Sequence, residues 1–138
     1  MLRVISELGY RPKIVSSVRR QSRKSGYGKD DWTMPAPLIA ALLEADQAHK
    51  LVFVDFYAKW CGACKTLEET TLANPKFKQT MQRFVFTKID TDEYPETARH
   101  FKIVGMPTLL VLDISGRELY RHIGPIGVNA LVAALPSQ

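Results

Sequence analysis

The fold is decided by one stretch of sequence, LVFVDFYAKWCGAC, at residues 51–64. Residues 51–58 are apolar except for Asp55, which predicts a strand buried on both faces, as in a sheet covered by helices. A helix is expected to begin at the cysteines that follow. Cys61 and Cys64 are the only cysteines of the chain. A pair at a strand-to-helix junction can close a small disulfide ring and open it again, which is typical of a dithiol redox centre.

The composition is ordinary for a soluble globular protein of one domain. The 138 residues are 46% hydrophobic and 24% charged, and a chain of this length can bury a core without extra cross-links. No apolar run is long enough for a transmembrane helix, and no secretory signal is visible. The net charge of +5 comes from residues 1–29, where eight basic residues face one acidic residue. A basic arm can bind nucleic acid, but we expect a solvated leader and no nucleic-acid partner.

The remaining patterns predict an α/β domain in the order β-α-β-α-β-β-α, a mixed sheet flanked by helices. Residues 1–36 are interpreted as a basic, partly disordered segment and linker, and residues 37–138 as the domain. A short strand is predicted within the first segment at residues 13–18. The predicted helices are 38–50, 61–69, 76–82, 95–101 and 127–135, and the later strands are 84–90, 108–113 and 118–123.

The two cysteines are expected to play different parts. Cys61 falls near the N-cap of the predicted helix, where free backbone N–H groups favour a thiolate and lower the thiol pKa below its free value of about 8.5. Cys64 lies one turn further in, and we expect it to be shielded and to break a mixed disulfide by attacking the exposed Cys61. A purely structural disulfide would close too short a loop to stabilise the fold much.

Two further alternatives are a zinc site and a pair of ordinary core cysteines. Zinc usually takes four protein ligands in a structural site, and the remaining candidates, His49, His100 and His122, do not have finger spacing. We therefore predict no bound metal.

Asp55 is the second informative residue, because an ionised carboxylate is costly to bury in an apolar strand. Burial should raise its pKa, so that it can exchange protons near neutral pH. We expect Asp55 to take the proton of Cys64, through water, as that thiol becomes the attacking group. Lys88, near the end of the next predicted strand, is a candidate charge partner in this proton relay. The alternatives are an Asp55 that faces solvent and an ordinary exposed Lys88.

The segment Gly105-Met106-Pro107-Thr108 is the third feature. Proline is poorly tolerated inside a central strand, so Pro107 should mark the first residue of one. A cis peptide bond at Pro107 would present the Met106 backbone beside the cysteines, where it could pair with an extended substrate segment. A trans turn proline is the alternative.

Residues 54–65 and 104–109, together with Gly124, resemble the thioredoxin family over about residues 37–135. The resemblance implies a thioredoxin fold in which Cys61 is the nucleophile, Cys64 the resolving thiol and Asp55 the buried acid or base. It also implies that Pro107 is a cis-proline and that Trp60 lines the substrate-binding surface. Met106 and Gly124 are expected to contribute to that surface.

Residues 70–77 look like the C-terminal domain of bacterial transmembrane thiol:disulfide interchange proteins. That resemblance implies an extracytoplasmic protein that passes electrons to substrate proteins, whereas the lack of a visible signal leaves the cytoplasm open. Ala63 stands where cytoplasmic thioredoxins typically carry proline. The residues between the cysteines shift the reduction potential, which spans about −270 to −120 mV in such sites.

We therefore expect a monomeric thiol:disulfide oxidoreductase that reduces protein disulfides. It would receive electrons from another protein dithiol and would need no bound cofactor. The alternative is a module that binds or delivers a soft metal ion of the copper or mercury type through Cys61 and Cys64.

Overall fold

A computed structural model of the chain describes residues 32–137. The predicted strand at residues 13–18 and the basic segment at residues 1–29 lie outside the described residues. In chain order the elements are α3 (Ala36–Ala48), β1 (Leu51–Tyr57), α4 (Gly62–Thr70), α5 (Pro75–Thr80), the 3₁₀ turn η1 (Met81–Arg83), β2 (Phe84–Asp90), α6 (Pro95–His100), β3 (Thr108–Leu112), β4 (Glu118–Ile123) and α7 (Val128–Ala134).

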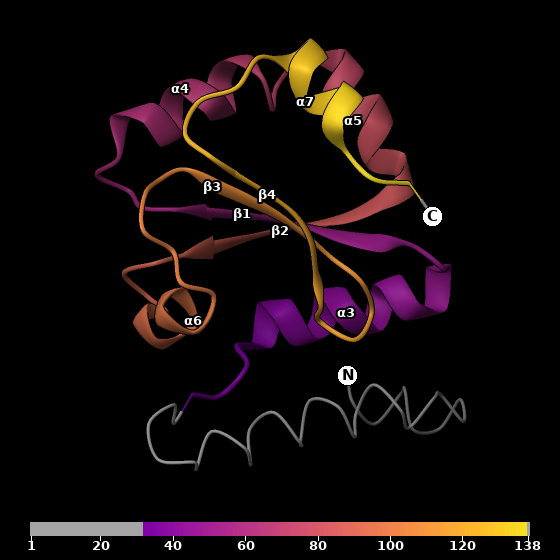
Figure 1. Cartoon of the computed structure of the whole chain (residues 1–138), viewed down its shortest axis with the longest axis vertical. Coiled ribbons are helices and arrows are strands. Elements are labelled where there is room, and N and C mark those ends of the chain that lie inside the picture. The colour runs from indigo at the N-terminus through magenta and orange to yellow at the C-terminus, as the bar shows by residue number, and fades with distance from the viewer. Residues whose placement is uncertain (1–31, 138) are drawn as a thin grey trace.

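The four strands form one mixed sheet in the order β2-β1-β3-β4. β1 runs parallel to β2 and antiparallel to β3, and β3 and β4 are antiparallel neighbours. Helices α3 and α6 lie on one side of the sheet, and α4, α5 and α7 lie on the other (Figure 1). The predicted α/β class with a mixed, helix-covered sheet is therefore confirmed.

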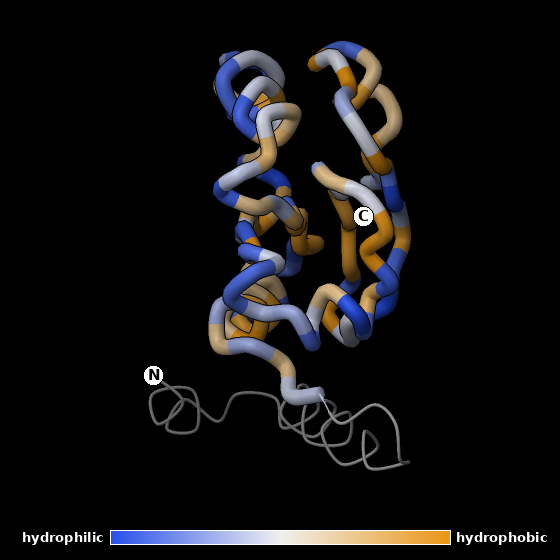
Figure 2. The backbone as a smooth tube through the Cα atoms, turned by 90° about the vertical axis from the view of Figure 1, so that its left-hand side faces the viewer, coloured by the Kyte–Doolittle hydropathy of each residue, from blue (hydrophilic) through white to orange (hydrophobic). Residues whose placement is uncertain are grey.

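β1 is buried on both faces, as its apolar sequence predicted. Its side chains alternate between two cores: Val54 and Phe56 belong to the core under α3, whereas Phe53 belongs to the core under α4, α5 and α7. Figure 2 shows the hydrophobic residues gathered along the central strands. Asp55 is two residues from Phe53, so the alternation of a strand places it on the α4 side of the sheet.

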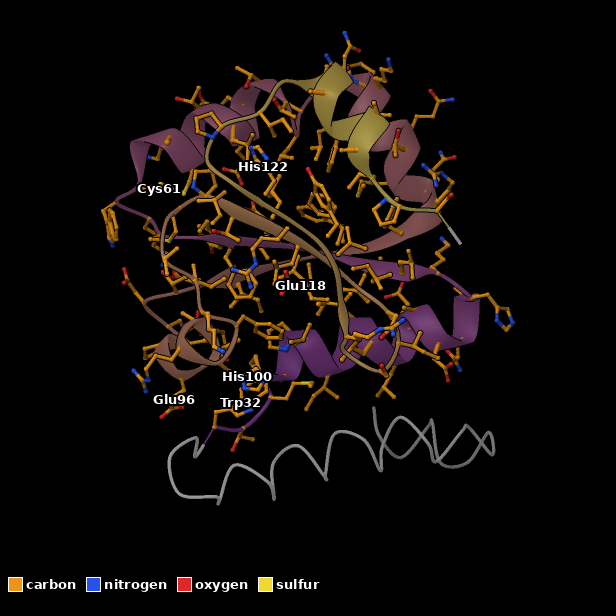
Figure 3. The ribbon with its side chains drawn as sticks, viewed as in Figure 1. Trp32, Cys61, Glu96, His100, Glu118 and His122 are labelled. Carbon is orange, nitrogen blue, oxygen red and sulfur yellow. A yellow bond between two sulfur atoms is a disulfide. The ribbon has the colours of Figure 1, made fainter. Side chains whose placement is uncertain are left out.

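The core begins before residue 37, the predicted start of the domain. Trp32 and Met34 are buried and belong to the core under α3. The ring of Trp32 stacks on His100 at the end of α6, with 3.9 Å between the ring centroids. In Figure 3 this pair lies well away from Cys61. The stretch interpreted as linker therefore ends in residues that anchor the chain to the fold.

The predicted elements differ from the observed ones mainly at helix ends. α3 begins two residues earlier than predicted, because Pro37 fits the first turn of a helix. It ends at Ala48, and the C-cap residue His49 lies in the left-handed region, with φ 58°. The predicted helix at residues 76–82 is divided into α5 and η1. Strands β2 and β4 have the predicted bounds.

Candidate active site

The two cysteines lie where β1 passes into α4. Cys61 is the N-cap of α4, with extended backbone angles, and forms a disulfide with Cys64 across a Cα–Cα distance of 5.3 Å. The backbone N–H of Cys64 donates to Cys61 Sγ at 3.1 Å. A thiolate at Cys61 would be stabilised by this same N–H and by the positive end of the helix dipole. The predicted N-cap position of Cys61 is confirmed, and Figure 3 shows it at the start of α4.

The predicted contrast in exposure between the two cysteines is wrong. Cys61 is 6% exposed and Cys64 is 8% exposed, so neither side chain is open to solvent in the disulfide. The reason is that both pack in one cluster with Ala58, which Tyr57 and Met106 cover. The asymmetry of the pair lies in its neighbours instead: a backbone N–H of the helix donates to Cys61, whereas Cys64 lines a pocket with the buried Asp55.

Asp55 is the buried acid that the sequence predicted. It is 3% exposed, and its Oδ1 has no hydrogen-bond partner among the described residues. Burial raises the pKa of Asp55 from 3.8 to about 6, because the ionised form loses its hydration. The positive charge of Lys88 opposes this rise and the negative charge of Glu68 adds to it. The predicted direction of the shift is confirmed.

Lys88 lies beside Asp55 in the register of β1 and β2, but its direct partner is Glu68 of α4. The ammonium group donates to Glu68 Oε2 and lies 4.3 Å from the centre of the Tyr57 ring. Burial tends to lower the pKa of Lys88, but the hydrogen bond and charge of Glu68, with the charge of Asp55, raise it on balance. Lys88 is therefore a fixed positive charge that acts on Asp55 through space.

One pocket joins the acid to the second cysteine. It has a volume of about 350 Å³, and its lining includes Asp55, Cys64 and Glu68. Two exposed lysines, Lys59 and Lys65, complete its polar rim. Cys61 is not among its lining residues. A water molecule in this pocket could therefore connect the Asp55 carboxyl group with Cys64, as the sequence analysis expected.

The peptide bond between Met106 and Pro107 is cis, as the family resemblance implied, and not trans, the alternative that the sequence left open. Pro107 directly precedes β3, and its carbonyl oxygen accepts a hydrogen bond of 2.8 Å from the backbone N–H of Gly124. Gly124 has a φ of +98°, a conformation that favours glycine. The structure thus brings Pro107 and Gly124 together, and it packs the Met106 side chain against the cysteine cluster.

Trp60 is 70% exposed beside the disulfide, as expected of a side chain that lines a binding surface. Its indole Nε1–H donates to Asp92 Oδ2 at 2.9 Å, and this hydrogen bond links the Trp60 ring to the loop after β2. Val104 and Ile123 are also exposed. Ile123 lies next to the Pro107 segment, since its Cγ2 is 3.2 Å from where a Cβ on Gly105 would lie.

The sequence analysis missed Glu68, Thr91 and Asp92. Glu68 follows Cys64 by four residues, so the two share one face of α4, and this spacing could have revealed it. Thr91 and Asp92 follow the carboxyl end of β2 and reach the site only through the parallel pairing of β1 with β2. Their contacts with Met106 and Trp60 depend on this tertiary arrangement.

Between residues 32 and 137, no group of three or more His, Cys, Asp and Glu side chains is arranged to hold a metal ion. No helix in the same part of the chain has the length and apolar character needed to span a bilayer.

Comparison with known proteins decides the family. The thioredoxin family model matches residues 41–136. The chain belongs to the thioredoxin family. This match, the fold and the paired cysteines together support thiol–disulfide oxidoreductase chemistry.

Relatives come from two branches. Thioredoxin H2-2 of Oryza sativa subsp. japonica is 42% identical over 55% of this chain and 54% of its own length. The thiol:disulfide interchange protein DsbD of Colwellia psychrerythraea is 34% identical over 65% of this chain and 16% of its own length. The oxidised C-terminal domain of DsbD from Neisseria meningitidis has a TM-score of 0.61 and 30% identity, covering 74% of this chain and 93% of that one. The chain thus spans about half of the first relative and a small part of the second.

Proposed function

We propose that this chain is a thiol:disulfide oxidoreductase that reduces disulfides of client proteins, with Cys61 attacking and Cys64 resolving. The observation that carries the assignment of roles is the different surroundings of the two sulfurs. A backbone N–H donates to Cys61 Sγ, whereas Cys64 shares a pocket with the buried Asp55. The first arrangement favours a thiolate, and the second offers a base to a thiol.

In the first step the Cys61 thiolate attacks one sulfur of the client disulfide. A Cys61–client bond forms, the client S–S bond breaks, and the released client sulfur leaves as a thiolate that takes a proton from water. In the second step Cys64 loses its proton to Asp55 and attacks Cys61 Sγ. The mixed disulfide breaks, the second client sulfur leaves as a thiolate that takes a proton from water, and Asp55 returns its proton to the solvent. The client has gained two electrons and two protons, and the chain carries the Cys61–Cys64 disulfide.

Asp55 suits the second step because its pKa lies at about 6. At pH 7 the carboxylate is mostly ionised and can accept the proton, yet it is basic enough to take a proton more readily than an ordinary aspartate would. Lys88 and Glu68 act as positioning residues in this scheme, since their charges move the pKa of Asp55 in opposite directions.

The client is expected to bind as an extended segment along Met106, Pro107 and Gly124, with Trp60 beside it. The exposed side chains of Val104 and Ile123 give this surface apolar character. Backbone pairing with an extended segment does not depend on its sequence, so several clients could be accepted. After turnover another protein dithiol must reduce the Cys61–Cys64 disulfide. The names of the relatives support both a thioredoxin role and a role like that of the DsbD C-terminal domain.

Two measurements test this proposal. Reduction of insulin disulfides, with dithiothreitol as the electron source, measures turnover, and equilibration with glutathione gives the reduction potential of the cysteine pair. A reduction potential of about −270 mV for the cysteine pair, together with insulin turnover, agrees with a reductase. A reduction potential of about −120 mV would indicate that the protein oxidises its clients, and would contradict the proposed direction of electron flow.

A further inference from the structure

A third sulfur-bearing side chain lies at the site. Met106 packs against the cluster formed by Ala58, Cys61 and Cys64, and its side chain is partly exposed. The other methionines of the described residues lie elsewhere: Met34 is buried under α3, and Met81 packs against the core on the opposite face of the sheet. Among the methionines of residues 32–137, Met106 is therefore the one that lies where a chemical change can affect client binding directly.

We propose that Met106 is a site of reversible oxidation, and that its conversion to methionine sulfoxide by a peroxide weakens client binding at the cysteine pair. The oxidation itself follows from the exposure and surroundings of Met106. Its effect on clients rests on the proposed function.

The reaction is a two-electron oxidation of the thioether. The Met106 sulfur attacks one oxygen of hydrogen peroxide, an S–O bond forms, and the O–O bond breaks. The departing hydroxide takes the remaining peroxide proton and leaves as water. In the disulfide form of the chain neither cysteine offers a thiolate to the peroxide, because both sulfurs are joined to each other. Met106 is then the sulfur nucleophile that remains at the site.

Thr91 provides a partner for the oxidised side chain. Its Oγ1 lies 3.3 Å from Met106 Sδ and 3.3 Å from the carbonyl oxygen of Tyr57, so one hydroxyl hydrogen serves two acceptors. A thioether sulfur is a weak acceptor. A sulfoxide oxygen is a much stronger one, so oxidation favours a hydrogen bond from Thr91 to Met106. This bond would hold the sulfoxide at the surface where the client lies.

Oxidation thus replaces an apolar contact with a polar one beside the exposed Val104 and Ile123. Thr91 can serve only part of the acceptor capacity of the sulfoxide oxygen, and an apolar client segment that covers it would remove the remaining hydrating water without offering a donor. Loss of hydration from a polar group is unfavourable enough that we expect about a tenfold fall in kcat/KM for insulin. Reduction of the sulfoxide should restore the original rate.

The experiment uses the full chain in its disulfide form. The protein is treated with hydrogen peroxide, desalted and digested, and the added oxygen is located by mass spectrometry. Insulin reduction is measured before treatment, after treatment, and after incubation with methionine sulfoxide reductases A and B. We expect oxygen on Met106, about a tenfold loss of kcat/KM, and recovery after the reductases.

Two variants sharpen the test, each compared with its own untreated rate. Met106→Leu should lose no activity on treatment, whereas the matched control Met81→Leu should lose as much as the unmodified sequence. The proposal is overturned if peroxide oxidises Met81 but leaves Met106 intact, if Met106→Leu loses activity to the same extent, or if the reductases restore nothing. A lack of insulin reduction before treatment would contradict the proposed function instead, and the mass spectrum would still decide whether Met106 is oxidised.

Discussion

Replacing Asp55 by asparagine should make the protein more stable at neutral pH. Asp55 is buried, and its pKa rises from 3.8 to about 6 on folding. An acid whose pKa is higher in the folded state binds its proton more tightly there. Its contribution to stability is therefore fully present below pH 3.8 and is lost as the pH rises through about 6.

The size of the effect follows from the shift. About two pKa units correspond to about 3 kcal/mol, so the ionised Asp55 lowers the free energy of unfolding by about this amount at pH 7.5 relative to its protonated form. The amide of an asparagine side chain cannot ionise, so Asp55→Asn removes this cost. We expect it to raise the free energy of unfolding by up to about 3 kcal/mol at pH 7.5, and the gain to disappear near pH 4.

Urea denaturation of the disulfide form between pH 4 and pH 8 measures this difference. Asp113→Asn is the matched control, because the pKa of Asp113 is lowered in the folded protein, whereas that of Asp55 is raised. Burial raises the pKa of Asp113, but hydrogen bonds from Ser115 and Arg117 and the charge of Arg117 outweigh that effect and lower it. Asp113→Asn should therefore reduce stability at neutral pH and have less effect as the pH falls. Equal pH dependence in Asp55→Asn and in the unmodified sequence would refute the assignment of Asp55 as the buried, perturbed acid.

Four further substitutions test the site. The charge of Glu68 raises the pKa of Asp55, so Glu68→Gln should move the acid limb of the pH–rate profile for insulin reduction to lower pH. The charge of Lys88 lowers that pKa, so Lys88→Met should move the acid limb to higher pH. Shifts of the two variants in the same direction would contradict the electrostatic account. Trp60→Ala should raise KM for insulin with a smaller change in kcat, since the exposed ring serves client binding. An unchanged KM in steady-state kinetics would contradict this role of Trp60. Cys61→Ser should abolish insulin reduction, and full turnover by this variant would rule out the mechanism.

The sequence predicted the sheet because its strands are strongly patterned. β1 is apolar except for Asp55, and β2 and β4 have the predicted bounds, since turn residues delimit them. The predicted helix ends were less accurate, because capping depends on backbone angles that composition does not determine. The positive φ of His49 after α3 is an example. Trp32 and Met34 were placed in a linker because their burial depends on packing against distant elements, among them α6.

The candidate site was predictable where its residues share a local motif. Cys61, Cys64 and Pro107 come from short signals, with the cis bond at Pro107 implied only by the family resemblance, and Asp55 comes from one carboxylate in an apolar strand. The relative exposure of the cysteines was not predictable, because the side chains that cover them come from separate parts of the chain. The ion pair of Lys88 with Glu68 was missed for the same reason, since it joins β2 to α4.

The central claim is that Cys61 attacks the client and Cys64 resolves the intermediate. Its most direct test is to mix reduced Cys64→Ser with insulin and to map the trapped mixed disulfide by mass spectrometry, beside Cys61→Ser treated in the same way. The account predicts that Cys64→Ser accumulates a client disulfide at Cys61, whereas Cys61→Ser accumulates little or none at Cys64. A stable client disulfide at Cys64 in the Cys61→Ser variant, with none at Cys61 in the other, would contradict it.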